Sequence, residues 1–92
     1  MKIAIGNDHA GVDLKEKIVE FLKCEGHEVT NVGTDTRESV DYPDIARAVA
    51  KLVNLNECDY GIVICGTGIG ISIAANKVLG IRCALCHNSF TA

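Results

Sequence analysis

Two short segments of the sequence carry residue types that could do chemistry. The first, residues 6–11, reads Gly-Asn-Asp-His-Ala-Gly and places an acid beside an imidazole, a pair suited to binding hydroxyl and phosphate groups or to moving protons. The second, residues 65–70, reads Cys-Gly-Thr-Gly-Ile-Gly. Its glycines allow the backbone to approach a ligand closely, and the N–H groups of a helix that begins there could bind a phosphate or stabilise an oxyanion.

The glycine-rich segment matches neither of the two common nucleotide-binding motifs. It lacks the Gly-Lys-Ser/Thr ending of a P-loop, and the spacing of Gly66, Gly68 and Gly70 differs from the Gly-x-Gly-x-x-Gly of dinucleotide-binding domains. The acidic residue that binds a ribose after such a loop is also missing. Two interpretations therefore stay open: a loop that binds a ligand, and a turn with a purely structural role.

Cys65 has the most suggestive position of the five cysteines, because it ends an apolar run and precedes a helix N-terminus. That setting favours a thiolate, which could act as a base or a nucleophile. The alternative is a small hydrophobic residue that completes a buried strand. Similar alternatives hold elsewhere: Asp8 could cap the following helix and leave His9 exposed, and Tyr42 could reach the same cleft or simply pack.

Cys83 and Cys86 form a Cys-x-x-Cys pair, which raises the alternative of a redox or metal protein. The pair falls in a predicted strand, where alternate side chains point to opposite faces. A zinc or dithiol site normally needs both sulfurs on one side of a tight loop, so buried thiols are favoured and no disulfide framework is implied. Cys24 and Cys58 have no chemical neighbourhood of this kind and are interpreted as structural.

The elements that must position these residues alternate between short apolar runs and helical periods. The expected strands cover residues 3–5, 28–32, 61–65 and 81–85, and helices are expected between them. The third strand is wholly apolar, which is typical of a central strand buried on both faces. The order βαβαβαβ predicts an α/β fold with a Rossmann-like parallel sheet, whose ligands bind at the carboxyl ends of the strands.

The helices are predicted from their apolar faces. In the first, Leu14, Ile18, Phe21 and Leu22 share one face, while Lys15 and the other charged residues fall elsewhere. The second starts at residues 41–44 with a proline in its first turn, and the third is a short helix of small residues that runs through residue 75.

Composition narrows the possible functions. The 92 residues allow one α/β domain, 1–92, with the 48% hydrophobic and 23% charged residues of a globular chain. A net charge of −3 without a basic run, and only 4% aromatic residues, argue against nucleic-acid binding. The longest uncharged stretch, residues 60–76, is too short and too rich in glycine for a membrane helix, and there is no signal-peptide core. We therefore expect a cytoplasmic protein.

Three blocks of the sequence resemble ribose-5-phosphate isomerase type B, and the related galactose-6-phosphate isomerases share much of the outline. The blocks are residues 5–11, residues 41–44 and, most specific of the three, residues 61–77; residues 80–82 also fit. The resemblance runs through essentially the whole chain in one register. It implies a Rossmann-like domain that interconverts ribose 5-phosphate and ribulose 5-phosphate through an enediolate, without a metal or an organic cofactor.

The resemblance also implies roles for individual residues. Cys65 matches the base that moves a proton between C1 and C2 of the sugar, and Thr67 with the N–H groups of the following residues would stabilise the enediolate. Asp8 and His9 match positions that hold the hydroxyl and phosphate ends of the substrate. The implied substrate-binding residues are Asp8, His9, Tyr42, Gly66, Gly68, Ile69, Gly70 and Ile71.

Family members continue beyond the length of this sequence, with a histidine that helps to open the sugar ring and arginines that bind the phosphate. Relative to the family, we expect domain 1–92 to lack the last strand and the C-terminal helices. The family also implies a homodimer with a shared active site. Two alternatives stay open: a non-catalytic phosphosugar-binding or truncated remnant domain, and an isomerase of galactose 6-phosphate or another hexose phosphate.

Overall fold

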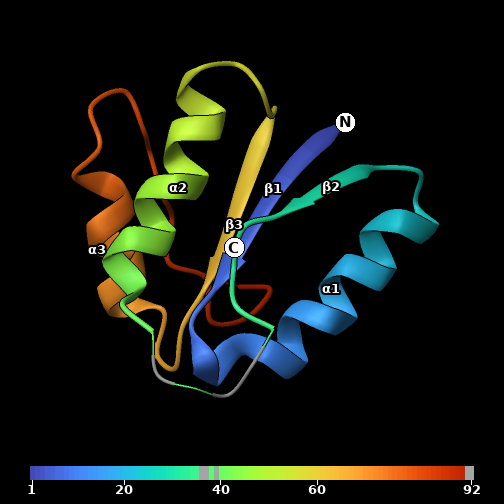
Figure 1. Ribbon diagram of the computed structural model, residues 1–92, viewed down its shortest axis with the longest axis horizontal. Coiled ribbons are helices and arrows are strands. Elements are labelled where there is room, and N and C mark those ends of the chain that lie inside the picture. The colour runs from blue at the N-terminus through green and yellow to red at the C-terminus, as the bar shows by residue number, and fades with distance from the viewer. Residues whose placement is uncertain (36–37, 39, 91–92) are drawn as a thin grey trace.

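A computed structural model describes residues 1–35, 38 and 40–90 of the chain. Strands and helices alternate along it, with one short 3₁₀ helix after the first strand (Figure 1). No helix of these residues is both long and apolar enough to span a membrane. The elements are β1 (Lys2–Asn7), η1 (His9–Gly11), α1 (Val12–Cys24), β2 (Glu28–Asn31), α2 (Tyr42–Asn54), β3 (Tyr60–Ile64) and α3 (Ile69–Asn76).

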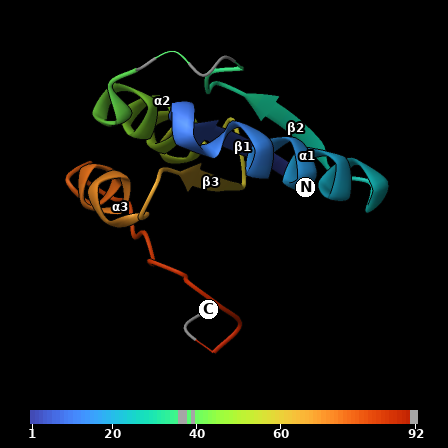
Figure 2. The same cartoon turned by 90° about the horizontal axis from the view of Figure 1, so that it is seen from below.

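The strands form one parallel sheet in the order β2-β1-β3, which confirms the predicted α/β, Rossmann-like fold. The central strand β1 pairs Lys2 with Glu28 of β2 and Ile3 with Tyr60 of β3. Helix α1 lies on one face of the sheet, and α2 and α3 lie on the other (Figure 2). Because all strands run in one direction, their carboxyl ends meet at the same edge of the sheet.

The core lies mainly between the sheet and α2. Ala4 and Val49 belong to one buried cluster, and Ala46, Ile71 and Ala75 form a second one between α2 and α3. Helix α2 packs directly on the backbone of β1: a Cβ added to Gly6 would lie 2.7 Å from a methyl group of Val49. This close approach fixes the height of α2 above the sheet.

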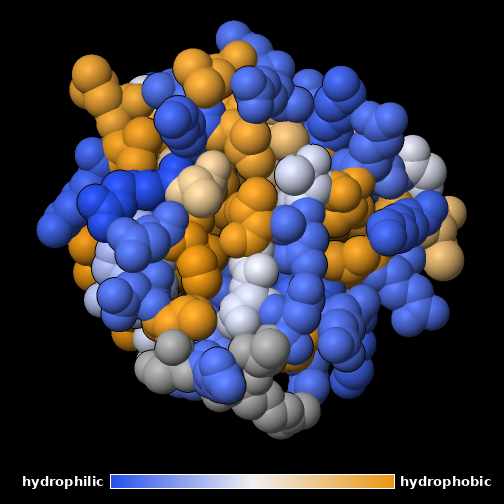
Figure 3. All heavy atoms as spheres, viewed as in Figure 1, coloured by the Kyte–Doolittle hydropathy of each residue, from blue (hydrophilic) through white to orange (hydrophobic). Residues whose placement is uncertain are grey.

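The predicted buried face of α1 is wrong in part. Leu22 is buried, but Leu14 and Phe21 are 52% and 63% exposed, and the side chains that α1 buries include Val12 and Lys15. Lys15 can take a core position because its ammonium group donates to the Thr34 carbonyl and forms an ion pair with a carboxylate. Hydrophobic side chains consequently reach the surface at several places between charged ones (Figure 3).

The predicted fourth strand, residues 81–85, is also wrong, because no residue between 81 and 90 is assigned to the three-stranded sheet. The main chain of Cys83 instead pairs with the side-chain amide of Asn76, at 2.8 and 2.9 Å. This segment and β3 both line a cavity of about 900 Å³, and in Figure 2 the chain after α3 runs away from the sheet.

The outer edge of β3 is therefore unpaired in the part of the chain that the structure describes. Only Ile64 of this strand is fully buried, while Tyr60 and Gly61 are exposed and Ile62 and Val63 are half-buried. The prediction of a strand buried on both faces holds for its carboxyl end alone, which is the end that leads into the glycine-rich loop.

Candidate active site

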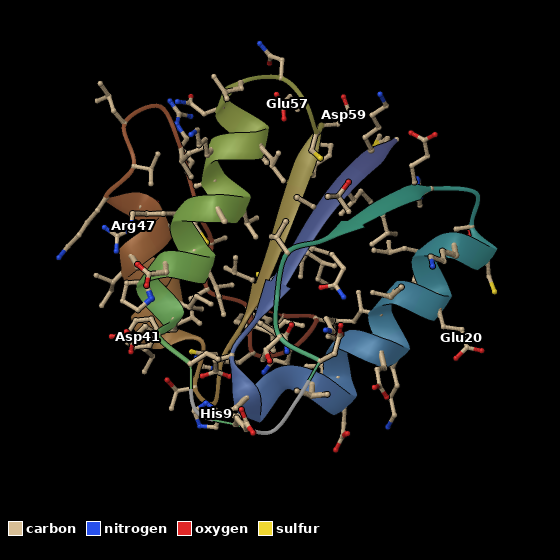
Figure 4. The ribbon with its side chains drawn as sticks, in the orientation of Figure 1. His9, Glu20, Asp41, Arg47, Glu57 and Asp59 are labelled. Atoms are coloured by element: carbon tan, nitrogen blue, oxygen red, sulfur yellow. The ribbon has the colours of Figure 1, made fainter. Side chains whose placement is uncertain are left out.

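The topology brings residues 6–11 and residues 65–70 together, as the sequence predicts. The N–H of Asp8 donates to the carbonyl of Ile64 at 3.0 Å, which joins the end of β1 to the end of β3. The side chain of Ala10 lies 3.8 Å from the place where a Cβ on Gly66 would sit. His9 lies at this end of the molecule, opposite the end that carries Glu57 and Asp59 (Figure 4).

The loop after β1 is held by Asp8, which is 7% exposed. Its Oδ1 accepts a hydrogen bond from the N–H of Ala10 at 2.9 Å, and its carbonyl accepts one from the N–H of Gly11 at 3.1 Å. Asp8 therefore does cap the helix that follows it. Nδ1 of His9 is buried and has no hydrogen-bond partner among the residues that the structure describes, so it is a polar atom that a ligand could satisfy.

In the loop after β3, a backbone N–H group donates a hydrogen bond to the sulfur of Cys65. Gly68 adopts the left-handed conformation, with φ of 78°, which a glycine takes without steric cost. Its N–H donates to Sγ of Cys65 at 3.1 Å, and the N–H of Ile69 donates to Oγ1 of Thr67 at 3.2 Å. The sulfur of Cys65 and the hydroxyl of Thr67 thus both lie at the start of α3, each with a backbone N–H directed at it.

Helix α3 offers further donors beside this sulfur. The N–H of Ser72 is bonded within the helix, to the carbonyl of Gly68 at 3.1 Å. The N–H groups of Gly70 and Ile71 precede it in the first turn, where no intrahelical acceptor is available. Of the four N–H groups that the family resemblance assigns to the enediolate, those of Gly68 and Ile69 thus already have partners within the loop. Gly70 and Ile71 supply the two that a negative oxygen could use.

Tyr42 lies against the opposite side of this helix start. Atoms of its ring and its hydroxyl lie 2.8–3.0 Å from the place where a Cβ on Gly70 would sit. Tyr42, Gly70 and Arg47 line a cavity of about 380 Å³, whereas Cys65, Gly66, Thr67 and Gly68 line the larger one. A shared cleft for Tyr42 and Cys65 therefore stays a prediction.

Within the Cys-x-x-Cys pair, the thiol pKa of Cys83 is raised rather than lowered. Burial, with a smaller contribution from Cys86, raises the pKa of Cys83 above its ordinary value, so this sulfur stays a thiol at neutral pH. Both sulfurs lie 3.9 Å from the carbonyl oxygen of Ala84. Among the described residues no three His, Cys, Asp or Glu side chains are grouped so that they could hold a metal ion.

Two buried polar residues near the site were missed by the sequence reasoning. Asn7 is fully buried at the end of β1, and Lys15 is 1% exposed on α1. A lysine on an amphipathic helix is normally solvent-exposed, so its type gave no signal. Its position did carry one, since Val12, Lys15 and Leu22 recur with helical spacing along one face.

The comparisons with known proteins agree with this geometry. The sequence model of the family described as Ribose/Galactose Isomerase matches residues 3–92. The chain is 52% identical over 91 residues to ribose-5-phosphate isomerase B of Escherichia coli, with 99% of the chain and 61% of that protein covered. It is 48% identical over 92 residues to galactose-6-phosphate isomerase subunit LacB of Clostridium acetobutylicum, with 100% of the chain and 53% of that protein covered.

A solved structure gives the same result. The ribose-5-phosphate isomerase B of Clostridium thermocellum superposes with a TM-score of 0.96 at 62% sequence identity, over 99% of this chain and 62% of that one. The chain thus spans about three fifths of the length of such relatives.

Proposed function

Because this chain belongs to the ribose/galactose isomerase family, we propose that the complete protein interconverts ribose 5-phosphate and ribulose 5-phosphate. The observation that carries the proposal is the position of Cys65 Sγ, which directly follows β3 and accepts a hydrogen bond from the N–H of Gly68 at 3.1 Å, beside the first turn of α3. An aldose–ketose conversion needs one base that serves two neighbouring carbons and donors for the negative oxygen of the enediolate. Both requirements have candidates within this one loop.

In the proposed mechanism, Cys65 as thiolate removes the proton from C2 of the open-chain aldose. The C2–H electron pair forms the C1–C2 double bond of the enediolate, while the electron pair of the C1 carbonyl moves to O1. The hydroxyl proton of O2 passes to O1, the resulting thiol returns its proton to C1, and C2 becomes the carbonyl carbon of the ketose. Negative charge on the enediolate oxygen is stabilised by the N–H groups of Gly70 and Ile71 and by the hydroxyl of Thr67. No net oxidation or reduction occurs, so the step needs no external electron acceptor.

Asp8 and His9 are proposed to bind the substrate from the neighbouring loop. Support comes from the unpartnered Nδ1 of His9 and from the bond between Asp8 N–H and Ile64, which keeps the two loops in contact. A homodimer that shares its active site and a cytoplasmic location belong to the same proposal; the homodimer rests on the family resemblance, and the location rests on the expectation from the sequence.

The test is turnover of ribose 5-phosphate by the complete protein and by Cys65→Ala, with Cys24→Ala as the matched control. Cys24 is an exposed cysteine on α1, so its removal should leave the rate within twofold. Loss of the base should lower turnover roughly 100- to 10,000-fold, because that is the usual contribution of general base catalysis. Calorimetric binding of ribose 5-phosphate should persist in Cys65→Ala. If that variant kept turnover within a few-fold of the parent, Cys65 could not be the base.

A second substrate is favoured by one specific finding, the 48% identity to a galactose-6-phosphate isomerase subunit. The same preparation should therefore be assayed with galactose 6-phosphate, and kcat/KM compared between the two sugars. If the protein bound either sugar but converted neither, the result would favour the non-catalytic phosphosugar-binding domain instead.

A further inference from the structure

Two buried polar side chains converge on a single carbonyl oxygen next to the site. The carbonyl of Thr34 follows β2, and it accepts one hydrogen bond from Nδ2 of Asn7 at 2.9 Å and another from Nζ of Lys15 at 2.7 Å. Asn7 comes from the end of β1 and Lys15 from the first half of α1. One oxygen thus ties together three elements that are distant in the sequence.

The amide of Asn7 is oriented toward backbone carbonyls on both sides. Its second N–H donates to the carbonyl of Asp8 at 2.9 Å, so both amide hydrogens bond carbonyl oxygens. Its Oδ1 is buried and has no hydrogen-bond partner within residues 1–35, 38 and 40–90, and it lies only 2.0 Å from where a Cβ on Gly33 would sit. A buried unpaired oxygen is costly and is rarely kept without another benefit.

The burial of Lys15 is also costly, because its side chain carries a charge. Its side chain is 2% exposed, and its ammonium group forms an ion pair with Asp35, whose carboxylate is 73% exposed and also accepts from Asn31 at 3.1 Å. Only the ammonium group of this pair is buried, and an ion pair whose charge is removed from water commonly adds no more stability than an apolar side chain of equal size would. Stability therefore does not explain why the helix buries a lysine at this position.

Both side chains restrain the loop that carries Asp8 and His9. The carbonyl of Asp8 accepts from Asn7 and from the N–H of Gly11, while its N–H is bonded to Ile64. Lys15 fixes the other anchor of the Asn7 amide, the Thr34 carbonyl. A shift of that carbonyl would release Asn7 and, with it, the backbone of Asp8.

We infer that Asn7 and Lys15 are positioning residues, which clamp the Thr34 carbonyl and thereby hold the loop of residues 8–11 where it receives the sugar phosphate. The inference rests on the proposed function for its second half, the effect on substrate. Its first half, the restraint of the loop, concerns the fold alone. Neither residue acts on the reacting carbons.

The test compares Lys15→Met with Lys17→Met in the complete protein. Both replace a lysine of α1 by an unbranched apolar side chain, but Lys17 is exposed. Two readouts are taken: amide hydrogen exchange at Ala10 and Gly11, whose N–H groups bond to Asp8, and KM and kcat for ribose 5-phosphate. Lys15→Met should accelerate exchange at both amides and raise KM roughly tenfold with kcat changed less, since small displacements of binding groups weaken productive binding strongly. Lys17→Met should change neither readout more than twofold.

The possible outcomes distinguish the restraint of the loop from the effect on substrate binding. Unchanged exchange at Ala10 and Gly11 in Lys15→Met would overturn the clamp, whatever the enzyme does. Faster exchange with an unchanged KM would overturn the role in substrate binding. If the parent protein turned over no sugar phosphate, the proposed function would have failed while the exchange result still decided the clamp. Asn7→Asp, which keeps the shape and removes both N–H donors, should accelerate exchange at the same amides, and a folded Asn7→Asp protein with parent-like exchange would also contradict the inference.

Discussion

Replacement of Gly33 by alanine should destabilise the protein more than any other glycine-to-alanine change at the ends of its strands. The added Cβ would lie 2.0 Å from Oδ1 and 2.5 Å from the backbone nitrogen of Asn7, far inside the 3.4 Å at which ordinary contact begins. Forcing an extra carbon into such a site costs about 1–3 kcal/mol. If Asn7 moves away, its two hydrogen bonds are lost as well, at about 1 kcal/mol each. We expect a total loss of about 3–5 kcal/mol in the free energy of unfolding.

Two other glycines provide controls of graded severity. Gly66→Ala places its Cβ 3.8 Å from Ala10, an ordinary contact, so the free energy of unfolding should change by less than about 0.5 kcal/mol. Gly26 has φ of 86° and no neighbour within 4 Å, so Gly26→Ala adds backbone strain alone, at about 1–2 kcal/mol.

The assay is urea unfolding of the parent and the three variants at equal protein concentration, with the slope of free energy against urea checked for constancy. The expected order of destabilisation is Gly33→Ala, then Gly26→Ala, then Gly66→Ala. The reasoning would be refuted if Gly33→Ala were as stable as Gly26→Ala or more stable. That result would mean that the segment after β2 accommodates the extra carbon without a loss of stability.

Three further predictions concern charge, packing and the segment after α3. Hydrogen bonds from Lys15 and, to a smaller extent, from Asn31 hold the pKa of Asp35 below its ordinary value. The stability that this carboxylate contributes is therefore complete above about pH 4 and is lost as the pH falls through its folded-state pKa. Asp35→Asn should flatten the acid side of a curve of stability against pH, and an unchanged slope would contradict the pairing. Val49→Ala, which removes two buried carbons from the main core, should cost about 2 kcal/mol in a urea titration, and a loss below about 0.5 kcal/mol would show that α2 packs loosely on the sheet. Asn76→Ala should accelerate hydrogen exchange at the Cys83 amide because that N–H then loses its acceptor, so exchange at the parent rate would show another restraint.

Most of the fold followed from local signals in the sequence. The apolar run that ends at Gly6, the Pro43 helix start and the glycine-rich turn before α3 all predict elements that the structure contains within a few residues. These signals depend on neighbours in the chain, which is why sequence alone reveals them. Residues 81–85 have the same apolar pattern as a strand, yet a strand also needs a hydrogen-bonding partner, and in the structure these residues do not pair with β3.

The residues of the candidate site were likewise predictable from the sequence only in part. Cys65 and Asp8 are recognisable because each follows a strand and the topology brings strand ends together. The roles inferred for Asn7 and Lys15 depend on the Thr34 carbonyl, which approaches them only after β2 has paired with β1. No spacing rule connects residues of three elements to one backbone oxygen, so this part of the site needed the structure.

The central position of β1 also bears on how the chain emerges from the ribosome. The strand is synthesised first, yet its partner residues Glu28 and Tyr60 lie 26 and 57 positions after Lys2 and Ile3. At roughly 5–20 residues per second, several seconds separate the synthesis of β1 from that of β3. We expect the β1-α1-β2 unit to pair first, and the side of β1 that later receives β3 to stay open to chaperones during that interval.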